Sequence, residues 1–392
     1  MRFLSLVLVC AAACAGAVSA AAPAAAPPTL FLSPAGSDSG PCSSAQPCRS
    51  LNAAYRLARP GQVVQIRAGH YPAQTLEAIS GRSAPAVVFR AAPGVRPVFD
   101  SLLEHASHVA IVGVTMRLFW TVENAPTDVT FRNVNTGVFT IRSSTNVSVI
   151  GGSVGPWDSN KLAGIEDTQI GDWDRAHYPQ PRKLLISGVS FHDFTHVFDP
   201  SAHTDCLQFT SGTDVILRGN RFRNCDADDI FIKGDFGPIK NFVVENNFFA
   251  RAATGSFTVR LGGDTAPYKC DNVLVRYNSA LQRMWSNCPL TGKGAVRFSS
   301  NVIAYEEEYH CSTSEETGVT WDHNVIGSGV PCGPTDVLAP VSFRNPARLD
   351  LHLSPGSPAI GRGDRSSYPR TDIDGQRRPR GSAPDAGADE IN

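Results

Sequence analysis

Apolar and polar residues alternate in short stretches that recur along most of the chain. In a strand, residues two positions apart point to the same side, so each stretch predicts a strand with one apolar face. The first apolar residues of these stretches are Val109, Val129, Val147, Leu184, Val215, Phe242, Val273, Val296 and Val319. They lie 18 to 37 residues apart, a spacing typical of one coil per repeat. We therefore predict an all-β protein, a right-handed parallel β-helix with a continuous apolar core.

Asparagine occupies one position of the repeat in each of the last five coils. These residues are Asn220, Asn247, Asn278, Asn301 and Asn324. Asparagine tolerates the left-handed conformation of a turn, and its amide can bond to the amide of the next coil. The column resembles the asparagine ladder of right-handed parallel β-helices. A β-sandwich with Asn-rich turns is the alternative, but it does not call for an unbroken column.

Both ends of the repeat resemble parts of secreted bacterial β-helix proteins. Residues 30–38, a short helical stretch at 51–57 and residues 60–71 resemble an N-terminal cap and first coil, which cover the unpaired strand edge. Segments 353–361 and 372–390 resemble a C-terminal tail. We expect the β-helix with its cap to span residues 28–335 and the tail to pack on it over residues 336–392.

Residues 1–22 predict a signal peptide. Arg2 precedes an apolar run from Phe3 to Val18, and small residues suited to cleavage follow it. Cys14 follows three alanines, as at a lipoprotein site, but the aliphatic residue usual three positions earlier is missing. We expect a secreted, extracellular protein rather than an anchored one, because no other stretch has the roughly 18 apolar residues of a membrane span.

Charge excludes nucleic acid as a partner. Without Arg2, 34 of the 35 basic residues remain against 36 acidic ones, a net charge of −2. Such a balance gives no bulk attraction to a polyanion. We expect a monomer whose recognition of charged ligands is local.

Eight cysteines follow the signal peptide, and an even number in an exported chain favours disulfides. Sequential pairing would staple loops within or between neighbouring coils. The pairs would be Cys42 with Cys48, Cys206 with Cys225, Cys270 with Cys288, and Cys311 with Cys332. None shows the close spacing of a zinc site.

Three stretches, 204–209, 226–233 and 256–263, align as neighbouring turns of one coil. The alignment superposes Leu207, Ile230 and Phe257. It places Asp205 over Asp228 and Lys233 over Arg260. Coils lie at strand spacing, about 4.7–4.9 Å, so like charges would be side by side unless an oppositely charged group joined them. We predict an active or ion-binding site here.

The same stretches resemble the motifs of calcium-dependent pectate lyases of polysaccharide lyase family 9. They read Thr204-Asp205-Cys206-Leu207, Asp228-Asp229-Ile230 and Arg260-Leu261-Gly262-Gly263. The resemblance implies that Asp205, Asp228 and Asp229 bind calcium and that Arg260 occupies the position of the base. Two positions differ from the family pattern: Ile232 stands where a fourth calcium Asp is usual, and Arg260 where a Lys is usual.

These residues suit β-elimination on a uronate polymer. Calcium bridges carboxylates of protein and substrate and acidifies the neighbouring ring proton. Arginine is a poor base, so the chemistry favours Lys233 as base and Arg260 as a clamp for the substrate carboxylate, whereas motif position reverses these roles. Arg142, which we expect in the column of Lys233 and Arg260 two coils earlier, and His203, two residues before Asp205, are candidate substrate-binding residues. We expect a polysaccharide lyase that acts on an acidic glycan.

Two other functions stay open. Asp205 followed by Asp228 and Asp229 also resembles the carboxylates of polygalacturonases, glycoside hydrolases of family 28, although their Gly-His-Gly and Arg-x-Lys segments are absent. A non-catalytic β-helix that binds glycans at the cell surface is the other. The insertion at 156–182 contains Trp157, Trp173 and Tyr178, and these rings could wall a groove and stack on sugars.

Overall fold

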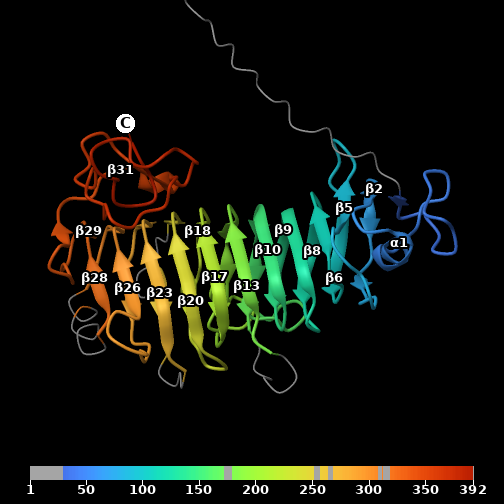
Figure 1. Ribbon diagram of the computed structural model, residues 1–392, viewed down its shortest axis with the longest axis horizontal. Helices are drawn as coiled ribbons and strands as arrows, with labels where there is room; N and C mark the ends of the chain where they lie inside the picture. The colour runs from blue at the N-terminus through green and yellow to red at the C-terminus, as the bar shows by residue number, and fades with distance from the viewer. Residues whose placement is uncertain are drawn as a thin grey trace, which may run out of the picture.

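The computed structural model describes residues 30–171, 179–250, 257–263, 268–307, 311 and 318–391. The strands stack side by side into a long solenoid (Figure 1). Nearly all pairings between strands are parallel, and 28 of the described strands belong to one connected network. The fold is a parallel β-helix, as the repeat predicts.

Each coil contributes strands to as many as three sheets, which we call the first, second and third sheets. The first sheet includes β1 (Leu30–Leu32), β2 (Val63–Ile66), β5 (Val87–Ala91), β7 (Val109–Val112), β13 (Arg182–Ser187), β17 (Gly212–Arg218), β20 (Ile239–Glu245), β23 (Cys270–Arg276), β26 (Val296–Ser299) and β28 (Thr320–Asp322). The second includes β3 (His70–Tyr71), β14 (Ser190–His192), β18 (Arg221–Arg223), β21 (Phe248–Phe249), β24 (Ser279–Ala280), β27 (Val302–Ile303), β29 (Val325–Ile326) and β30 (Val337–Leu338). The third includes β4 (Gln74–Leu76), β12 (Gln169–Ile170), β16 (Leu207–Phe209), β19 (Ile230–Ile232), β22 (Val259–Leu261) and β25 (Met284–Ser286).

Four long strands bend from one sheet into another, and four short strands lie outside the stack. The long strands are β6 (Val98–Glu104), β8 (Thr115–Val122), β9 (Thr127–Ile141) and β10 (Thr145–Val154). Outside the stack, β11 (Trp157–Asp158) pairs with β15 (Phe194–Thr195), and β31 (Phe343–Asn345) pairs with β32 (Asp350–Leu353) around the 3-10 helix η1 (Pro346–Arg348).

The first sheet has the register that the apolar repeat predicts. Each first apolar residue pairs with its counterpart one coil away from Val109 to Val296, and Arg297 opposite Thr320 continues the register to Val319. These residues point inward and are buried. Burial of one face of every coil forms the core along the whole solenoid.

The predicted asparagine ladder lies at the corner between the first and second sheets. Each of its five side-chain amides donates to the next coil at 2.9–3.0 Å, and all five residues are buried. The last amide, that of Asn324, donates to the carboxylate of Asp336. The ladder therefore ends on an aspartate that the column in the sequence did not include.

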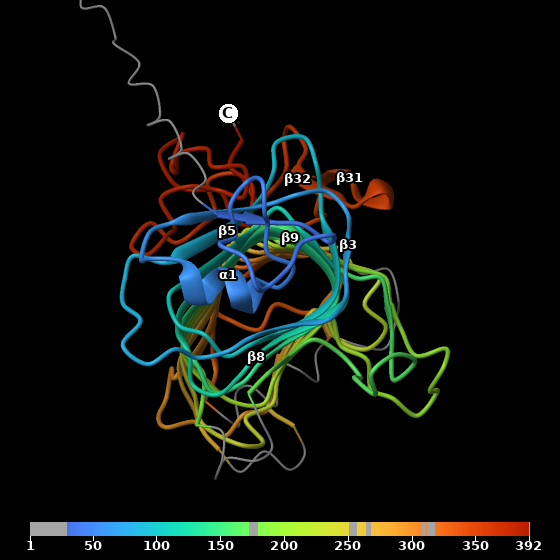
Figure 2. The same cartoon turned by 90° about the vertical axis from the view of Figure 1, so that its right-hand side faces the viewer.

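The N-terminal end is closed by the helix α1 (Leu51–Leu57), which lies across the opening of the first coil (Figure 2). The Ser50 hydroxyl accepts a hydrogen bond from the Ala53 N–H at 3.1 Å and caps the helix. Leu51, Ala54 and Tyr55 are buried against the coil. The helix thus covers apolar groups that the first coil would otherwise expose.

The C-terminal residues lie along one side of the solenoid (Figures 1 and 2). The Gly387 N–H donates to the Ser300 carbonyl at 2.8 Å, and the Ala388 N–H donates to the Ser279 hydroxyl at 3.0 Å. The Tyr277 hydroxyl donates to the Asp364 carbonyl at 2.8 Å. These contacts join the tail to several coils.

The four disulfides join the pairs that sequential pairing predicts. They are Cys42–Cys48, Cys206–Cys225, Cys270–Cys288 and Cys311–Cys332. Among the described residues, no helix has the length and apolar character needed to cross a bilayer. The predicted signal peptide, residues 1–22, lies outside the described residues.

Candidate functional site

Two buried carboxyl groups and one imidazole lie close together where two neighbouring strands of the third sheet, β16 and β19, begin. Asp205 and Asp228 precede β16 and β19 by two residues, and His203 lies in the segment that leads into β16. One ligand atom from each of the three lies within 4.8 Å of the others. Both carboxyl groups are buried, whereas the His203 side chain is 48% exposed. The cluster therefore opens to solvent on the His203 side.

Hydrogen bonds hold Asp205 in place. Its Oδ1 accepts the backbone N–H of Asp228 at 2.8 Å, and its Oδ2 accepts the Gln208 amide at 3.1 Å. The Nδ1 atom of His203 lies 3.3 Å from the same Oδ2. Asp205 thus bonds directly to the backbone of the next coil and fixes the spacing between the two acids.

Asp228 has one bonded oxygen and one that accepts no hydrogen bond from the described residues. Oδ1 accepts the Phe257 N–H at 2.8 Å. Oδ2 is buried, and its nearest cation is the Arg260 guanidinium at 3.8 Å. A buried carboxylate oxygen in this state is costly unless a cation or a donor reaches it.

The environment changes the protonation of this cluster. Burial, and next the charge of Asp205, raise the pKa of Asp228 to about 7. The hydrogen bond to Asp205 raises the pKa of His203 above its ordinary value. The protonation state of the cluster therefore changes near neutral pH, and a bound cation would favour the ionised form of Asp228.

The preceding coil adds two acids that the sequence analysis did not assign to the site. Gln169 pairs with Gln208, so Glu166 occupies the position of Asp205 one coil earlier. Asp167 is buried and accepts the backbone N–H of Asp205. Burial, and next the charges of Asp205 and Glu166, raise the pKa of Asp167 well above its ordinary value.

A signal for these acids exists in the sequence. Residues 166–170 read Glu-Asp-Thr-Gln-Ile and residues 205–209 read Asp-Cys-Leu-Gln-Phe. The two stretches share an acid, then a Gln three residues later and an apolar residue after it. The first of them lies in a long insertion, where no repeat position marks it as a coil.

The predicted stacking of Lys233 over Arg260 is wrong. Val259, not Phe257, pairs with Ile230, so Arg260 lies opposite Phe231. A slip of two residues keeps every side chain on its predicted face, so the apolar alternation cannot detect it. The predicted stacking of Asp205 over Asp228 agrees with the register of β16 and β19.

The two cations nevertheless converge on one aromatic ring. The Lys233 Nζ lies 4.9 Å from the centre of the Phe231 ring, and the Arg260 guanidinium lies 4.4 Å from it. His203 contacts the same ring at 5.6 Å. Both cations thus sit beside the acid cluster, although they come from different columns.

Three aromatic rings surround Arg260. Besides Phe231, the Phe257 and Trp285 rings lie 5.6 and 5.4 Å from its guanidinium carbon. The side chain is 20% exposed. Rings at these distances hold a guanidinium by cation–π attraction and limit its rotation. Arg260 is therefore fixed close to Asp228 with part of its surface open.

The Leu-Gly-Gly segment after Arg260 has a structural reason. Gly262 has a φ of +84°, and a Cβ there would lie 2.6 Å from the backbone N of Cys288. A side chain at this position would push the next coil away. The glycine explains this part of the motif without a role in chemistry.

Three other predicted positions lie around the cluster. Asp229 is buried, its N–H bonds to the Phe257 carbonyl at 3.1 Å, and its carboxylate is not one of the three clustered ligand atoms. Ile232, at the position of the family's fourth ligand, is fully buried in the core. Arg142 forms an ion pair with Glu123 at 2.8 Å and shares the column of Lys233, but it lies three coils before it rather than the predicted two, because the insertion adds the coil of β12.

The cluster has the donor chemistry of a divalent cation site. Calcium takes six to eight oxygens and accepts carboxylates readily. Asp205 and Asp228 offer carboxylates within reach of one ion, and the Asp228 oxygen that accepts no hydrogen bond is available as a metal ligand. Since two carboxylates supply few of these oxygens, the remaining ligands would come from water or from a substrate.

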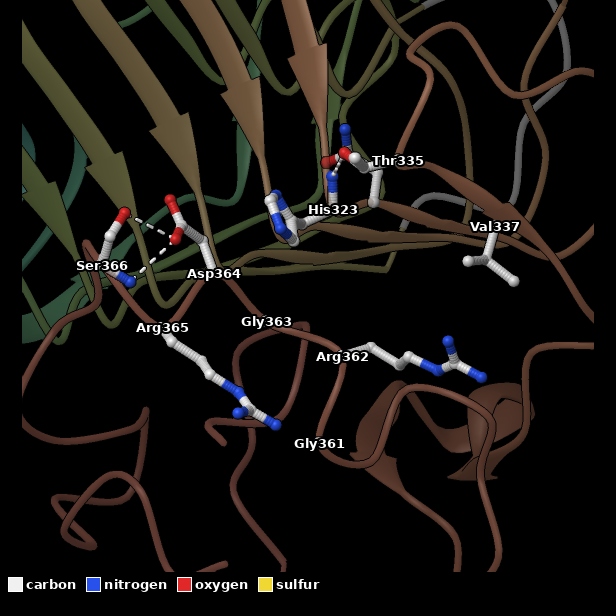
Figure 3. Close-up of a pocket in the computed structure, with 10 residues that line it drawn as sticks. His323, Thr335, Val337, Gly361, Arg362, Gly363, Asp364, Arg365 and Ser366 are labelled. Carbon is white, nitrogen blue, oxygen red and sulfur yellow. Dashed lines mark hydrogen bonds between the residues drawn. The ribbon is translucent and has the colours of Figure 1, made fainter. Parts of the chain in front are cut away.

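Two further groups of acids and histidines have other partners. Asp322 and Asp364 both accept hydrogen bonds from Arg297, and His352 lies between Asp350 and Asp374. Asp364 also borders a cavity of about 380 Å³ between the last coils and the tail (Figure 3). In Figure 3 the hydroxyl and N–H of Ser366 bond to this carboxylate. None of the residues that line this cavity belongs to the cluster on the third sheet.

Comparison with known proteins places the fold. No family model matches the sequence, and no curated protein matches it. The crystal structure of pectate lyase Pel9A is similar over 93% of this chain and 96% of its own, with a TM-score of 0.56 and 15% identity. A rhamnogalacturonan lyase is similar over 80% of this chain and 85% of its own, with a TM-score of 0.44 and 11% identity. The chain has a pectate-lyase-like parallel β-helix.

Proposed function

We propose that this protein is a polysaccharide lyase that cleaves an acidic, uronate-containing glycan by calcium-assisted β-elimination. The observation that carries the proposal is the meeting of Asp205 and Asp228 with Lys233 and Arg260 around Phe231. A uronate offers a carboxylate that needs cations and a ring proton that needs a base. The likeness to pectate lyase Pel9A adds the fold as support.

Asp205 and Asp228 would hold the calcium ion, and Asp229 stays a candidate ligand. Bound there, calcium would draw charge from the substrate carboxylate and acidify the neighbouring ring proton. His203 lies at the exposed edge of the cluster and would contact the sugar beside it. Arg142 would contact the chain farther along the same column.

Lys233 is the proposed base and Arg260 the proposed carboxylate clamp. Arginine is a poor base because its guanidinium stays protonated in proteins, whereas a lysine amine is one of the side chains that serve as general bases. The neutral amine takes the proton from the ring carbon that bears the carboxylate. The electron pair left on that carbon forms a double bond as the bond from the neighbouring carbon to the glycosidic oxygen breaks. That oxygen then takes a proton from water, and the hydroxide left behind takes the proton held by Lys233, which restores both the water and the neutral amine.

Export is part of the proposal. The four disulfides form and persist in oxidising compartments. Residues 1–22 have the pattern of a signal peptide. An acidic polysaccharide outside the cell is the substrate class that agrees with this location.

The test is incubation of the purified protein with polygalacturonate, alginate and glycosaminoglycans, with and without a chelator. We expect the ultraviolet absorbance of an unsaturated product from one of them and its loss with the chelator. Lys233→Ala should lower kcat by about 10²-fold or more. Lys240→Ala, which removes a half-exposed lysine paired with Asp271 on the first sheet, should leave the rate unchanged.

The raised pKa of Asp228 favours hydrolysis as the second candidate, because a buried protonated carboxyl is a possible general acid. Hydrolysis gives new reducing ends without an unsaturated product. If neither signal appears with any glycan of this panel, the remaining candidate is a non-catalytic β-helix that binds glycans. The lyase proposal fails in both cases.

A further inference from the structure

Two aromatic side chains, those of Phe198 and Tyr305, stand out from the other rings of the described chain. They are 60% and 39% exposed, and the other described Phe, Tyr and Trp side chains are buried or only partly exposed. A single exposed apolar residue is ordinary. These two rings are of interest because hydrogen bonds and ion pairs connect their segments to the candidate site.

Phe198 lies at the tip of an ordered loop. Its backbone N–H donates to Asp158 Oδ1 at 3.1 Å, and the same oxygen accepts the Thr195 hydroxyl at 3.1 Å. Asn160 donates to Asp199 at 2.7 Å. Polar bonds thus fix the backbone on both sides of Phe198, while its ring faces solvent.

The loop is built onto the candidate site. The Ser159 and Thr204 hydroxyls share a hydrogen bond of 2.5 Å, and Thr204 immediately precedes Asp205. The His203 N–H donates to the Glu166 carboxylate. Phe198 therefore belongs to the coil of Asp205, in the segment that leads into the cluster.

Tyr305 is joined to the site from the other direction. Its hydroxyl donates to Glu307 at 3.2 Å, and Glu307 forms an ion pair with Arg283. The Arg283 guanidinium lies 4.9 Å from the Phe257 ring, and the Phe257 N–H bonds to Asp228. Tyr305 lies three coils beyond Asp228, about 14 Å at strand spacing.

Of the three aromatic residues that the sequence suggested for sugar stacking, the one that the structure describes has another role. Trp157 is 5% exposed, its indole N–H donates to the Ile165 carbonyl at 3.0 Å, and a Cβ on Gly137 would lie 2.8 Å from its ring. It supports the loop from inside. Trp173 and Tyr178 lie outside the described residues. Among the described Phe, Tyr and Trp residues of segments 156–171 and 193–204, Phe198 is the one whose ring faces solvent.

We propose that Phe198 and Tyr305 are distal sugar-binding platforms for a polymeric acidic glycan that lies across the coils of the candidate site. This rests on the proposed function, which supplies the glycan. An exposed ring stacks on the apolar face of a sugar, while the charged cluster, which begins in the coil of Phe198 and lies before the coil of Tyr305, binds carboxylates. The pair therefore selects long chains over short oligomers.

The test compares Phe198→Ala and Tyr305→Ala with Phe198→Tyr and Tyr305→Phe, which keep a ring. The probes are polygalacturonate and a galacturonate trisaccharide. We expect each alanine variant to raise the KM for the polymer roughly tenfold, the effect of one lost apolar contact, with kcat and trisaccharide kinetics unchanged. The ring-keeping variants and Leu57→Ala, a half-exposed residue of α1, should match the parent protein.

Retardation of each variant in a native gel containing polygalacturonate gives a readout that needs no cleavage. If both alanine variants are retarded as strongly as the parent protein, the proposed sugar-binding role of Phe198 and Tyr305 is wrong. The lyase proposal would still stand if the parent protein forms the unsaturated product. Weaker retardation of the alanine variants without any unsaturated product supports the platforms and rejects the lyase reaction. If the parent protein cleaves another polymer of the panel, the same variants are compared with that polymer, and a parent protein that neither binds nor cleaves any polymer of the panel overturns this proposal. Thermal melts of every variant show whether it is folded.

Discussion

The charge of Asp228 depends directly on the fold. Burial and the neighbouring Asp205 raise its pKa to about 7, so its carboxyl group gains or loses a proton near neutral pH. The proton relieves both the desolvation and the repulsion. A cation bound to this carboxylate would do the same, so proton and cation compete for one oxygen.

This competition predicts how pH and calcium change stability. The pKa of Asp228 is raised on folding, so its contribution is fully present below about pH 4 and is lost as pH rises through about 7. Calcium needs the ionised form. We therefore expect calcium to raise the Tm more at pH 8 than at pH 5, as measured by scanning calorimetry.

The variant Asp228→Asn should lose this calcium effect at both pH values. Asp271→Asn, which changes an acid on the first sheet paired with Lys240, serves as the control and should keep it. An equal rise in Tm for Asp228→Asn and the parent protein would show that calcium binds elsewhere.

At the scale of the elements, the asparagine ladder connects coils through side chains rather than strands. Asn278 accepts two N–H groups of Asn247 and donates to the Val244 carbonyl and to Asn301. All of these groups are buried. The ladder therefore adds stability only while each member is bonded on both sides.

Asn278→Ala should lower the free energy of unfolding by about 3 kcal/mol, because it leaves buried partners without hydrogen bonds. Urea denaturation followed by tryptophan fluorescence measures this. Asn241→Gly is the control, since Asn241 lies in β20 with a φ of +55° and its side chain bonds to Asp214 and Asn272 on the exposed face. We expect that change to cost well under half as much, and equal losses would refute the ladder's role.

The disulfide Cys206–Cys225 joins two segments that flank the acid cluster. Cys206 follows Asp205, and Cys225 precedes Asp228 by three residues. Replacing both cysteines with alanine should cost about 3 kcal/mol, as expected for a loop of this length, and should weaken calcium binding in titration calorimetry. Replacing Cys42 and Cys48 should leave calcium binding unchanged. Similar calcium affinities in both double variants would contradict a link to the site.

At the scale of the whole molecule, one buried cation, Arg378, joins segments of the C-terminal tail to one another. The Arg378 guanidinium donates to the carbonyls of Asp385 and Gly387 at 2.7 and 2.8 Å and lies 3.5 Å from Glu390. It also lies 4.9 Å from the Tyr277 ring of a coil. The tail therefore folds around Arg378 and packs with it against the solenoid.

Arg378→Ala should lower stability by about 3 kcal/mol or more, because Glu390 and two carbonyls lose their buried partner. Limited proteolysis should then cut within residues 336–391 sooner than in the parent protein. Arg365→Ala, an exposed residue of the same tail, should leave the digestion pattern unchanged. Unchanged digestion of Arg378→Ala would show that other contacts hold the tail.

The sequence by itself determined the elements that local repetition controls. The spacing of apolar residues predicted the coils and the register of the first sheet, because alternation and burial set which face is inward. The column of asparagines predicted the ladder for the same reason. The order of the cysteines agreed with all four disulfides. Asp205 over Asp228 was predictable because both precede strands in register.

Only the tertiary structure decided what depends on contacts between columns. The register of β22 could slip by two residues without changing any face, so it is packing against β19 that places Arg260 opposite Phe231. Asp167 entered the site because an insertion folds back into a coil. The end of the ladder at Asp336, the packing of the tail and the exposure of Phe198 and Tyr305 likewise depend on contacts between residues far apart in sequence. The periodic sequence specifies each coil, whereas the chemistry arises where side chains of different coils meet.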